Sequence, residues 1–387
     1  MEFNFNLKKI KPSGIRKLFD LAQGQKDLIS FGIGEPDFIT PAHIREAAKK
    51  ALDQGYTRYT PNLGFPELRK ALANKLKIKN NISVTPEEVV VTSGGTEALF
   101  FSFYTLINPG DEVIIPDPGF VVYESQIYFA GGKPVNFPLR GENNFHPEVK
   151  ELKNYITPKT RAILINSPSN PTGAAFTEEE LLAIANIARE KNLFVISDEL
   201  YEDIIYNGRK HISIASLPGM KERTITIFGF SKSYAMTGWR LGYLVAQVNL
   251  VKEIAKLLQN TSVCANSVTQ KAGLAAIEGP QECVQEMFLA YSERRNVLVQ
   301  GLNEIRGLSC YAPEGTFYAF VNIKNTGMTA EELSIYLLER CKVVTVPGTA
   351  FGAQGEGYIR LSFATSLEDI KEGIKRIKRG IEDISNR

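Results

Sequence analysis

The chain of 387 residues has few of the residues that build metal centres and disulfide frameworks. It contains three histidines and four cysteines, and the cysteines stand far apart with no CxxC pair among them. We therefore expect neither a zinc site nor a disulfide scaffold. Long apolar runs are also missing, and residues 1–17 are charged throughout, without the apolar segment of a secretory signal. These absences predict a cytoplasmic protein that has no membrane span and no bound metal.

An excess of charge of one sign is missing as well. Lys and Arg number 45 and Asp and Glu 43, so the formal net charge is +2. This balance argues against an electrostatic grip on nucleic acid or on an anionic membrane. Two basic stretches, residues 8–17 and 371–379, are interleaved with apolar residues at helical spacing, and we interpret them as solvated helix faces.

What the chain does contain is an alternation of short apolar runs and longer amphipathic runs. With 43% hydrophobic residues, it is long enough for two domains. Several of the short runs are nearly continuous Val, Ile, Leu and Phe, as in strands covered on both faces. The predicted strands are residues 88–92, 112–116, 161–166, 193–198, 224–230 and 241–246. Helices between them, such as the one that the capping box Thr177–Glu180 opens, predict an α/β fold with a mainly parallel central sheet flanked by helices.

The last hundred residues have a different, α+β pattern. Helices are predicted at residues 280–304, after the capping box Thr329–Glu332, and after Ser366–Asp369, with strands at 315–323, 342–346 and 358–363. We therefore expect a large domain over residues 45–280. A smaller domain would combine residues 281–387 with the N-terminal segment 1–44.

A lysine follows one of the predicted strands in a setting that suits a phosphate-bearing cofactor. Ser231-Lys232 comes directly after residues 224–230, and Arg240 follows nearby. A lone lysine at this place is ordinarily a surface residue. Here a hydroxyl and a guanidinium surround the same point, which suits a phosphate dianion, and a lysine beside phosphate can hold an aldehyde cofactor as an imine.

Three further segments place polar groups at strand ends, where open α/β sheets bind ligands. Asn170-Pro171-Thr172-Gly173 is either a turn or a hydrogen-bond donor site. Asp198 is either a helix N-cap or the partner of a ring nitrogen. The glycine-rich turn Ser93–Thr96 precedes a helix predicted over residues 98–107, whose N-terminus attracts phosphate. It lacks the GK[ST] of a P-loop, and no GxGxxG occurs, which argues against an ATPase or a dinucleotide-binding oxidoreductase.

These segments together resemble a known family. SGGTEAL, NPTG, SDELY, SKSYAMTGWR and GYIRLSFA occur in that order, preceded by SFGIGEPDF and YTPNLGFPELR. This set is similar to the class I/II aminotransferases of pyridoxal-phosphate (PLP) fold type I, and most of all to the prokaryotic aspartate and aromatic aminotransferases. The resemblance runs essentially end to end. It implies a PLP cofactor and a homodimer with composite active sites.

The resemblance also implies a role for each matching residue. Lys232 would carry PLP as a Schiff base and act as the catalytic base, while Asp198 pairs with the ring nitrogen. Asn170 and Tyr201 would bind the phenolic oxygen, and Arg360 the substrate carboxylate under the loop that contains Gly34. The remaining cofactor contacts would be the phosphate ligands Gly95, Thr96, Ser231 and Arg240, the stacking ring of Phe120, and Tyr59, which reaches the neighbouring subunit's phosphate.

The implied activity is amino transfer from an L-amino acid to 2-oxoglutarate by a ping-pong mechanism. Some aspartate enzymes of this group carry a lysine at the position of Thr96. Aromatic residues also gather near the expected site, namely Phe120, Tyr59, Tyr201 and Tyr318. Both points favour an aromatic or broad-range donor. Aspartate or alanine transamination stays open, as does a PLP-dependent lyase of the same fold.

Overall fold

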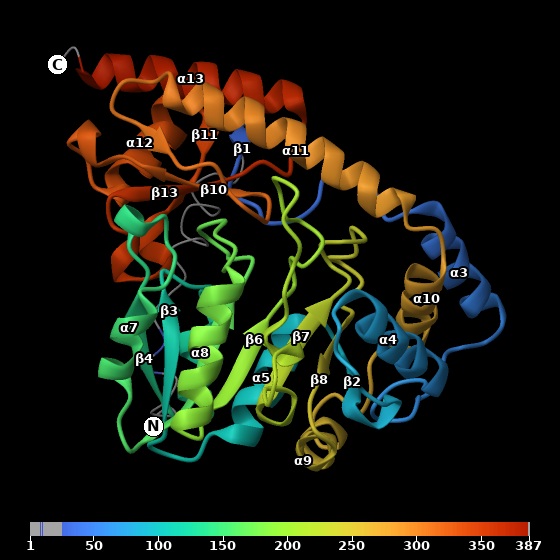
Figure 1. Ribbon diagram of the computed structural model, residues 1–387. Helices are drawn as coiled ribbons and strands as arrows, with labels where there is room; N and C mark the ends of the chain where they lie inside the picture. Colours follow the sequence, from blue (N-terminus) through green and yellow to red (C-terminus); the bar gives the residue numbers. More distant parts are fainter. Residues whose placement is uncertain (1–7, 9, 11–24, 386–387) are drawn as a thin grey trace, which may run out of the picture.

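The computed structural model describes residues 8, 10 and 25–385. Residues 1–7, 9 and 11–24 lie outside the described residues. They include most of the basic stretch 8–17 and the first half of the predicted N-terminal segment 1–44. Over residues 25–385 the chain forms two sheet-centred regions, with the larger sheet below and a smaller sheet under long helices above (Figure 1).

The larger sheet confirms the predicted α/β architecture. Within the described residues it has seven strands in the order β2-β8-β7-β6-β5-β3-β4. Only β8 runs antiparallel to its neighbours. The strands are β2 (Val89–Thr92), β3 (Glu112–Asp117), β4 (Lys133–Pro138), β5 (Thr160–Asn166), β6 (Phe194–Asp198), β7 (Thr224–Gly229) and β8 (Gly242–Val245).

Helices cover both faces of this sheet because alternate residues of its strands are apolar on both sides. Val113 and Ile115 face one layer of helices, whereas Ile114 faces the other. The first layer is α5 (Gly95–Leu106), α6 (Val122–Phe129) and α9 (Val248–Gln259). The second is α3 (Ala42–Asp53), α4 (Pro66–Lys79), α7 (Val149–Leu152), α8 (Glu178–Glu190) and α10 (Ser267–Glu278).

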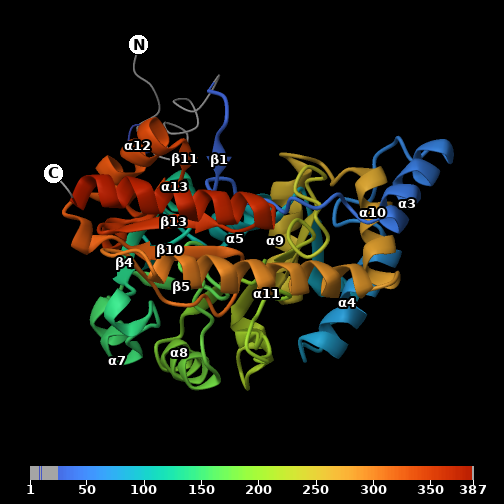
Figure 2. The same cartoon turned by 90° about the horizontal axis from the view of Figure 1, so that it is seen from above.

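The smaller sheet is antiparallel, in the order β12-β13-β10-β9, and a separate parallel pair joins β1 to β11. Helices α11 and α13 pack against each other across this region, as the view from above shows (Figure 2). The strands are β1 (Ile29–Ser30), β9 (Ser309–Cys310), β10 (Tyr318–Asn322), β11 (Val343–Val344), β12 (Val346–Pro347) and β13 (Tyr358–Ser362). The helices are α11 (Glu282–Asn303), α12 (Ala330–Cys341) and α13 (Leu367–Ser385).

Short 3-10 turns connect these elements at residues 86–88, 141–143, 153–155, 214–216, 221–223, 324–326, 348–351 and 353–355. The division of the chain at residues 44/45 and 280/281 into two domains stays a prediction. The pairing of β1 with β11 places residues 29 and 30 beside the C-terminal region, whereas α3 packs on α10 of the larger region.

Three local expectations were wrong or incomplete. The strand β4 was not predicted, the helix α5 begins at Gly95 instead of residue 98, and Asp198 is not a helix N-cap because turns follow β6. Each difference concerns a strand edge or a strand end, where turn geometry and not apolar periodicity decides the structure.

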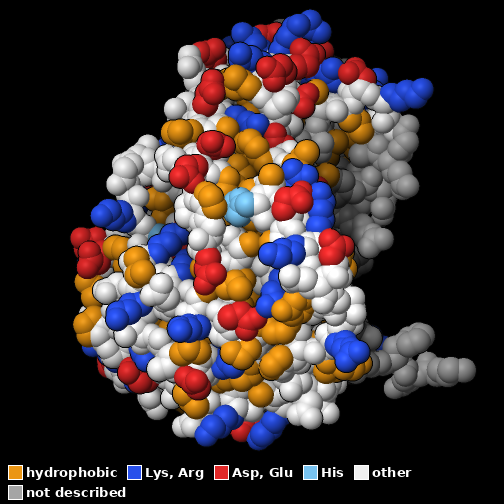
Figure 3. Space-filling view, turned by 90° about the vertical axis from the view of Figure 1, so that its right-hand side faces the viewer, with side chains coloured by type: hydrophobic (Ala, Val, Ile, Leu, Met, Phe, Trp, Pro, Cys, Tyr) orange, Lys and Arg blue, Asp and Glu red, His pale blue; other side chains and the backbone are white. Residues whose placement is uncertain are grey.

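The surface agrees with the balanced composition where Figure 3 displays it. On the side that carries α3, α4 and α10, basic, acidic and apolar side chains are interspersed. No helix among residues 25–385 combines the length and apolar character that crossing a bilayer would need.

Candidate functional site

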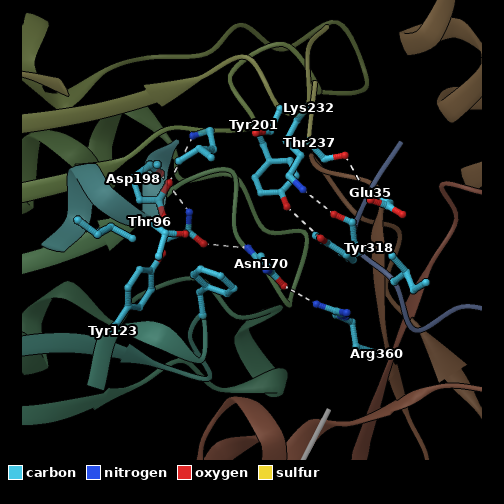
Figure 4. Close-up of a pocket in the computed structure, with 18 of the residues that line it drawn as sticks. Glu35, Thr96, Tyr123, Asn170, Asp198, Tyr201, Lys232, Thr237, Tyr318 and Arg360 are labelled. Atoms are coloured by element: carbon cyan, nitrogen blue, oxygen red, sulfur yellow. Dashed lines mark hydrogen bonds between the residues drawn. The ribbon is translucent and has the colours of Figure 1, made fainter. Parts of the chain in front are cut away.

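A cavity of about 570 Å³ lies between the two regions, at the carboxyl ends of the central parallel strands (Figure 4). Asn166 and Asp198 end β5 and β6, and Lys232 follows β7, while Tyr318 and Arg360 reach the cavity from β10 and β13. Of the twelve residues predicted for the site, the cavity wall contains eleven: Gly34, Gly95, Thr96, Phe120, Asn170, Asp198, Tyr201, Ser231, Lys232, Arg240 and Arg360.

Asp198 is a buried acid in this wall, with 4% of its surface exposed. Its Oδ2 accepts a 2.6 Å hydrogen bond from the hydroxyl of Tyr123, and its Oδ1 a longer one, 3.4 Å, from the amide of Leu200. Burial raises the pKa of Asp198 to about 6, against the lowering effect of the Tyr123 hydrogen bond. The carboxylate is therefore costly to keep charged unless a positive partner faces it.

Lys232 lies half-buried in the same cavity, and its Nζ donates a hydrogen bond to the carbonyl oxygen of Gly34. Burial, together with the nearby guanidinium groups of Arg360 and Arg240, lowers the pKa of Lys232 to about 8. An amine with a pKa near neutrality exchanges protons readily at physiological pH, as a general base must.

Arg360 is buried, with 4% exposure, and its guanidinium is held on two sides. One terminal nitrogen donates to Asn170 Oδ1 at 2.9 Å, and the other donates to the carbonyl oxygen of Gly32 at 2.7 Å. Its Nε finds no hydrogen-bond acceptor within residues 25–385. A buried guanidinium N–H without a partner is costly, so this nitrogen suits an incoming carboxylate.

The N-terminus of α5 forms one end of the cavity. Gly95 and Thr96 open this helix, whose first amides have no acceptors within the helix and attract anions. Arg240 stands opposite in the left-handed conformation, with a φ of 53°. Gly94, at a φ of 93°, approaches it so closely that a Cβ would lie 2.6 Å from the Arg240 guanidinium. With the Ser231 hydroxyl nearby in the wall, this end has the groups that suit an anion.

The remaining wall combines rings and an amide. Phe120 lies between β3 and α6 and packs edge-on against Tyr123, with ring centroids 5.7 Å apart. The main-chain N–H of Asn170 donates a hydrogen bond to Asn166 Oδ1 at 2.9 Å, which fixes the start of the NPTG segment. Tyr201 is buried, and its hydroxyl lies 2.9 Å from that of Tyr318.

Tyr59 is the one predicted site residue that a single chain does not bring to the cavity. Its side chain is 85% exposed, and it does not line the wall. An aromatic side chain so exposed on one chain is available to another chain.

Two wall residues with clear contacts were missed or undervalued from the sequence. Tyr123 received no role, although it bonds to Asp198, and Tyr318 was seen only as one of several aromatics. Both belong to segments, VVYES and GTFYAF, that read as packing residues. No sequence signal apart from an alternating strand pattern marked Tyr318.

A second polar cluster lies outside the cavity. His146 bridges two carboxylates, with its Nδ1 2.9 Å from Glu180 Oε1 and its Nε2 2.9 Å from Glu314 Oε2. Arg209 pairs with Glu314 at 2.7 Å. Burial of His146 disfavours its charged form, but the hydrogen bonds to Glu180 and Glu314 outweigh burial and raise its pKa to about 9. His146 is therefore a cation at neutral pH.

Comparison with known proteins places this geometry in a family. The model "Aminotransferase class I and II" matches residues 26–377. An aspartate aminotransferase of Pyrococcus abyssi is 47% identical, and an aromatic-amino-acid aminotransferase of Thermococcus litoralis is 46% identical, each match covering 99% of both chains. The crystal structure of an aromatic aminotransferase from Pyrococcus horikoshii superposes with a TM-score of 0.91 at 45% identity, covering 95% of this chain and 99% of that one. The chain therefore belongs to the class I and II aminotransferases and is a PLP-dependent aminotransferase of fold type I.

Proposed function

We propose that this aminotransferase moves the amino group of an aromatic or broad-range L-amino acid to 2-oxoglutarate by a ping-pong mechanism. The observation that carries the proposal is the convergence of Lys232, Asp198 and Arg360 on one cavity. An amine base, a buried acid and a carboxylate-binding guanidinium are the three groups that amino transfer requires of the protein.

The chemistry of the wall fits PLP. Asp198 is a buried carboxylate that needs a positive partner, which a protonated ring nitrogen supplies. The opposite end of the cavity has the helix N-terminus at Gly95, the Thr96 and Ser231 hydroxyls, and Arg240, which suit the phosphate. Between these ends, the Phe120 ring would stack on the cofactor.

Asn170 and Tyr201 complete the cofactor contacts that we propose. Both line the cavity and can donate a hydrogen bond to the phenolic oxygen of the ring. When bound, PLP supplies an electron sink for the substrate's Cα and a temporary acceptor for its amino group.

The protein's own part in the reaction is to hold the substrate and move one proton. We assign to Arg360 the substrate α-carboxylate, through the Nε that has no acceptor among the described residues and the adjacent terminal N–H. Lys232 would then take the proton from the substrate's Cα and return it to the C4′ carbon of the cofactor, as its pKa of about 8 allows. The segment that contains Gly32 and Gly34 accepts hydrogen bonds from both groups through its main-chain carbonyls.

The donor preference rests on the charges and rings of the wall. Beyond Lys232, Arg240 and Arg360, no lysine or arginine is among the described residues that line the cavity, and Thr96 stands where a cation could grip a distal carboxylate. The wall instead offers Phe120 and several tyrosines. Aromatic side chains are favoured on such a surface. Aspartate is the second candidate because a relative with 47% identity is named an aspartate aminotransferase.

The acceptor comes from the family resemblance. A second carboxylate, as in 2-oxoglutarate, finds no further cation in the wall of one chain, so we propose that a group from outside that wall binds it. Such a group would also bind the distal carboxylate of aspartate, which keeps aspartate as the second candidate donor. Independently, the exposed Tyr59 is available to a second chain, and we propose a homodimer in which each subunit completes the other's site.

The test is a titration of the purified holoenzyme with phenylalanine and, separately, with aspartate. The visible absorption of the bound cofactor and the 2-oxo acid formed are measured at each concentration. We expect phenylalanine to convert the cofactor at lower concentration, with phenylpyruvate as the product. The reverse order would assign the enzyme to aspartate. Release of a product other than the matching 2-oxo acid would indicate a lyase.

A matched variant tests the reason for the preference. Thr96→Lys adds one cation at the wall and also removes a hydroxyl that we assign to the phosphate, so both donors are measured at saturating PLP. The ratio of kcat/KM for aspartate to that for phenylalanine should then rise about tenfold or more. Tyr104→Lys places the same charge at an exposed position of the same helix, away from the cavity, and serves as the control. An unchanged ratio in Thr96→Lys would show that charge at this position does not select the donor.

A further inference from the structure

Tyr318 lies between the two halves of the site. It is the first residue of β10, only 2% exposed, and its side chain enters the cavity between Tyr201 and Arg360 (Figure 4). Its hydroxyl is 2.9 Å from the Tyr201 hydroxyl, and the Arg360 guanidinium carbon lies 4.4 Å from its ring centroid. One side chain thus contacts a group assigned to the cofactor and a group assigned to the substrate.

The hydroxyl pair has a preferred direction once Tyr201 serves the cofactor. A phenol carries a single hydrogen, so Tyr201 cannot donate to the cofactor's phenolic oxygen and to Tyr318 at the same time. Tyr318 must then donate to Tyr201. Two such bonds in series strengthen each other because each polarises the next. Tyr318 therefore orients the Tyr201 hydroxyl and makes it a better donor.

The ring of Tyr318 acts on Arg360 in a different way. The ends of the guanidinium are held by Asn170 and by the Gly32 carbonyl, which fixes their positions but not the tilt of the plane. A cation over an aromatic face is attracted to it, and a buried one more strongly than an exposed one. The Tyr318 ring supplies this third constraint on the plane, together with the Phe351 ring, whose centroid lies 4.8 Å from the same guanidinium carbon.

The main chain at Gly34 leaves little space beside the Tyr318 hydroxyl. A Cβ on Gly34 would lie 2.1 Å from the Tyr318 hydroxyl oxygen, so the main chain at Gly34 rests directly on the phenol. A side chain at residue 34 would force the Tyr318 hydroxyl to shift. Glycine at this position is thus a requirement of Tyr318.

We propose that Tyr318 is a positioning residue with two separable actions. Its hydroxyl aligns Tyr201 toward the cofactor, and its ring aligns Arg360 toward the substrate carboxylate. The inference rests on the roles proposed above for Tyr201 and Arg360.

Two substitutions separate the actions. Tyr318→Phe removes the hydroxyl and keeps the ring, so Tyr201 becomes a weaker donor to the phenolic oxygen. The pH midpoint of the cofactor's visible band should rise by about half to one unit, and kcat should fall several-fold. The dissociation constant of 3-phenylpropionate, which probes Arg360, should stay within about twofold. Tyr318→Leu removes the ring as well and should weaken 3-phenylpropionate binding roughly tenfold.

The double variant shows whether the hydroxyl acts through Tyr201. Adding Tyr318→Phe to Tyr201→Phe should not move the band midpoint any further, because the group through which it acts is gone. Tyr358→Phe makes the same change on the neighbouring strand β13, outside the cavity wall, and should alter neither quantity.

The outcomes distinguish this inference from the proposed function. A wild-type band that does not titrate, or a wild-type enzyme that does not bind 3-phenylpropionate, would contradict the proposed roles of Tyr201 or Arg360. If the wild type behaves as expected, an unmoved midpoint in Tyr318→Phe overturns the action of the hydroxyl. Unchanged binding in Tyr318→Leu overturns the action of the ring. Should Tyr318→Leu fail to fold, Tyr318→Met, which is unbranched and lacks a ring, replaces it.

Discussion

The hydroxyl of Tyr123 donates a 2.6 Å hydrogen bond to Oδ2 of Asp198, and both side chains are buried. This bond favours the carboxylate over the acid and opposes the effect of burial on the Asp198 pKa. Tyr123 enters the cavity from α6 in the helical layer, while Asp198 ends a central strand. Their contact therefore joins a cavity group to the packing of the large sheet.

Replacing Tyr123 with Phe should raise the pKa of Asp198. A protonated Asp198 no longer balances a positive ring nitrogen, so the acid limb of the kcat/KM profile should move to higher pH. The expected shift is about one pH unit, since a hydrogen bond to a charged group is worth roughly 1.5–3 kcal/mol before compensation. The measurement is kcat/KM for phenylalanine between pH 5 and pH 9.

Tyr104→Phe is the control for that substitution, because Tyr104 is an exposed tyrosine of α5 outside the cavity wall. An acid limb that does not move in Tyr123→Phe would show that Asp198 keeps its charge without the phenol.

Asp198→Ala should lose far more than about tenfold in rate at every pH, because the electron sink itself is weakened.

The exposed Tyr59 and the cavity residue Lys232 permit a complementation test. Lys232→Ala should abolish turnover but still bind PLP, and Tyr59→Ala should weaken cofactor binding. If Tyr59 serves the neighbouring subunit, a dimer with one copy of each variant has one site with both defects and one intact site. Such a heterodimer, isolated through two different affinity tags, should recover about half of the wild-type activity.

A single-chain site gives the opposite result. If Tyr59 belonged to the same subunit as Lys232, each site of the heterodimer would carry one defect and activity would stay near that of the separate variants. Each variant isolated with the same tag pair as a homodimer is the matched control. Turnover by pure Lys232→Ala would contradict the assignment of the catalytic base.

The His146 cluster makes stability depend on pH in a predictable direction. The folded pKa, about 9, lies above the ordinary value of 6.5. The stabilisation that protonated His146 gives to the folded protein is therefore fully present below about pH 6.5 and is lost as the pH rises through about 9. Glu314 stays ionised throughout this window because hydrogen bonds and charges from His146 and Arg209 outweigh burial and lower its pKa to about 2.

His146→Gln should remove this dependence. The free energy of unfolding of the wild type, from urea titrations, should fall by about 1–3 kcal/mol more than that of His146→Gln between pH 6.5 and pH 10. The free energies of unfolding of the two proteins should become similar near pH 10. His43→Gln, at a histidine outside the cluster, is the control. A variant that loses stability with pH as steeply as the wild type would show that His146 is not charged in the folded protein.

The sequence predicted what depends on apolar pattern and strand order. Six of the seven strands of the large sheet were expected near their observed ends because they are buried on both faces and read as apolar runs. β4 was not, since KPVNFP contains two prolines and a lysine and lies at the sheet edge. The reversed direction of β8 has no signature in its composition.

The residues of the site also fall into those that the sequence could predict and those that it could not. Asp198 and Lys232 follow apolar strands, so their place at one sheet edge could be predicted from the sequence. Tyr318 and Arg360 come from another sheet, and the distance between Tyr318 and Tyr201 depends on how the two regions pack. Residues 117 places apart leave no joint pattern in a single sequence. The contact of Tyr123 with Asp198 depends in the same way on how α6 packs.

The main-chain carbonyls of Gly32 and Gly34, which accept hydrogen bonds from Arg360 and Lys232, have a consequence for ligand design. A ligand that takes either N–H must displace a bond that the protein already makes, so binding is an exchange and its net gain is small. The Arg360 Nε is different, because it gives up no bond within the described residues. An inhibitor whose acceptor reaches this nitrogen and leaves the two carbonyls in place would give up only the acceptor's own hydrogen bond to water, so its net gain in affinity should be larger than that of an exchange.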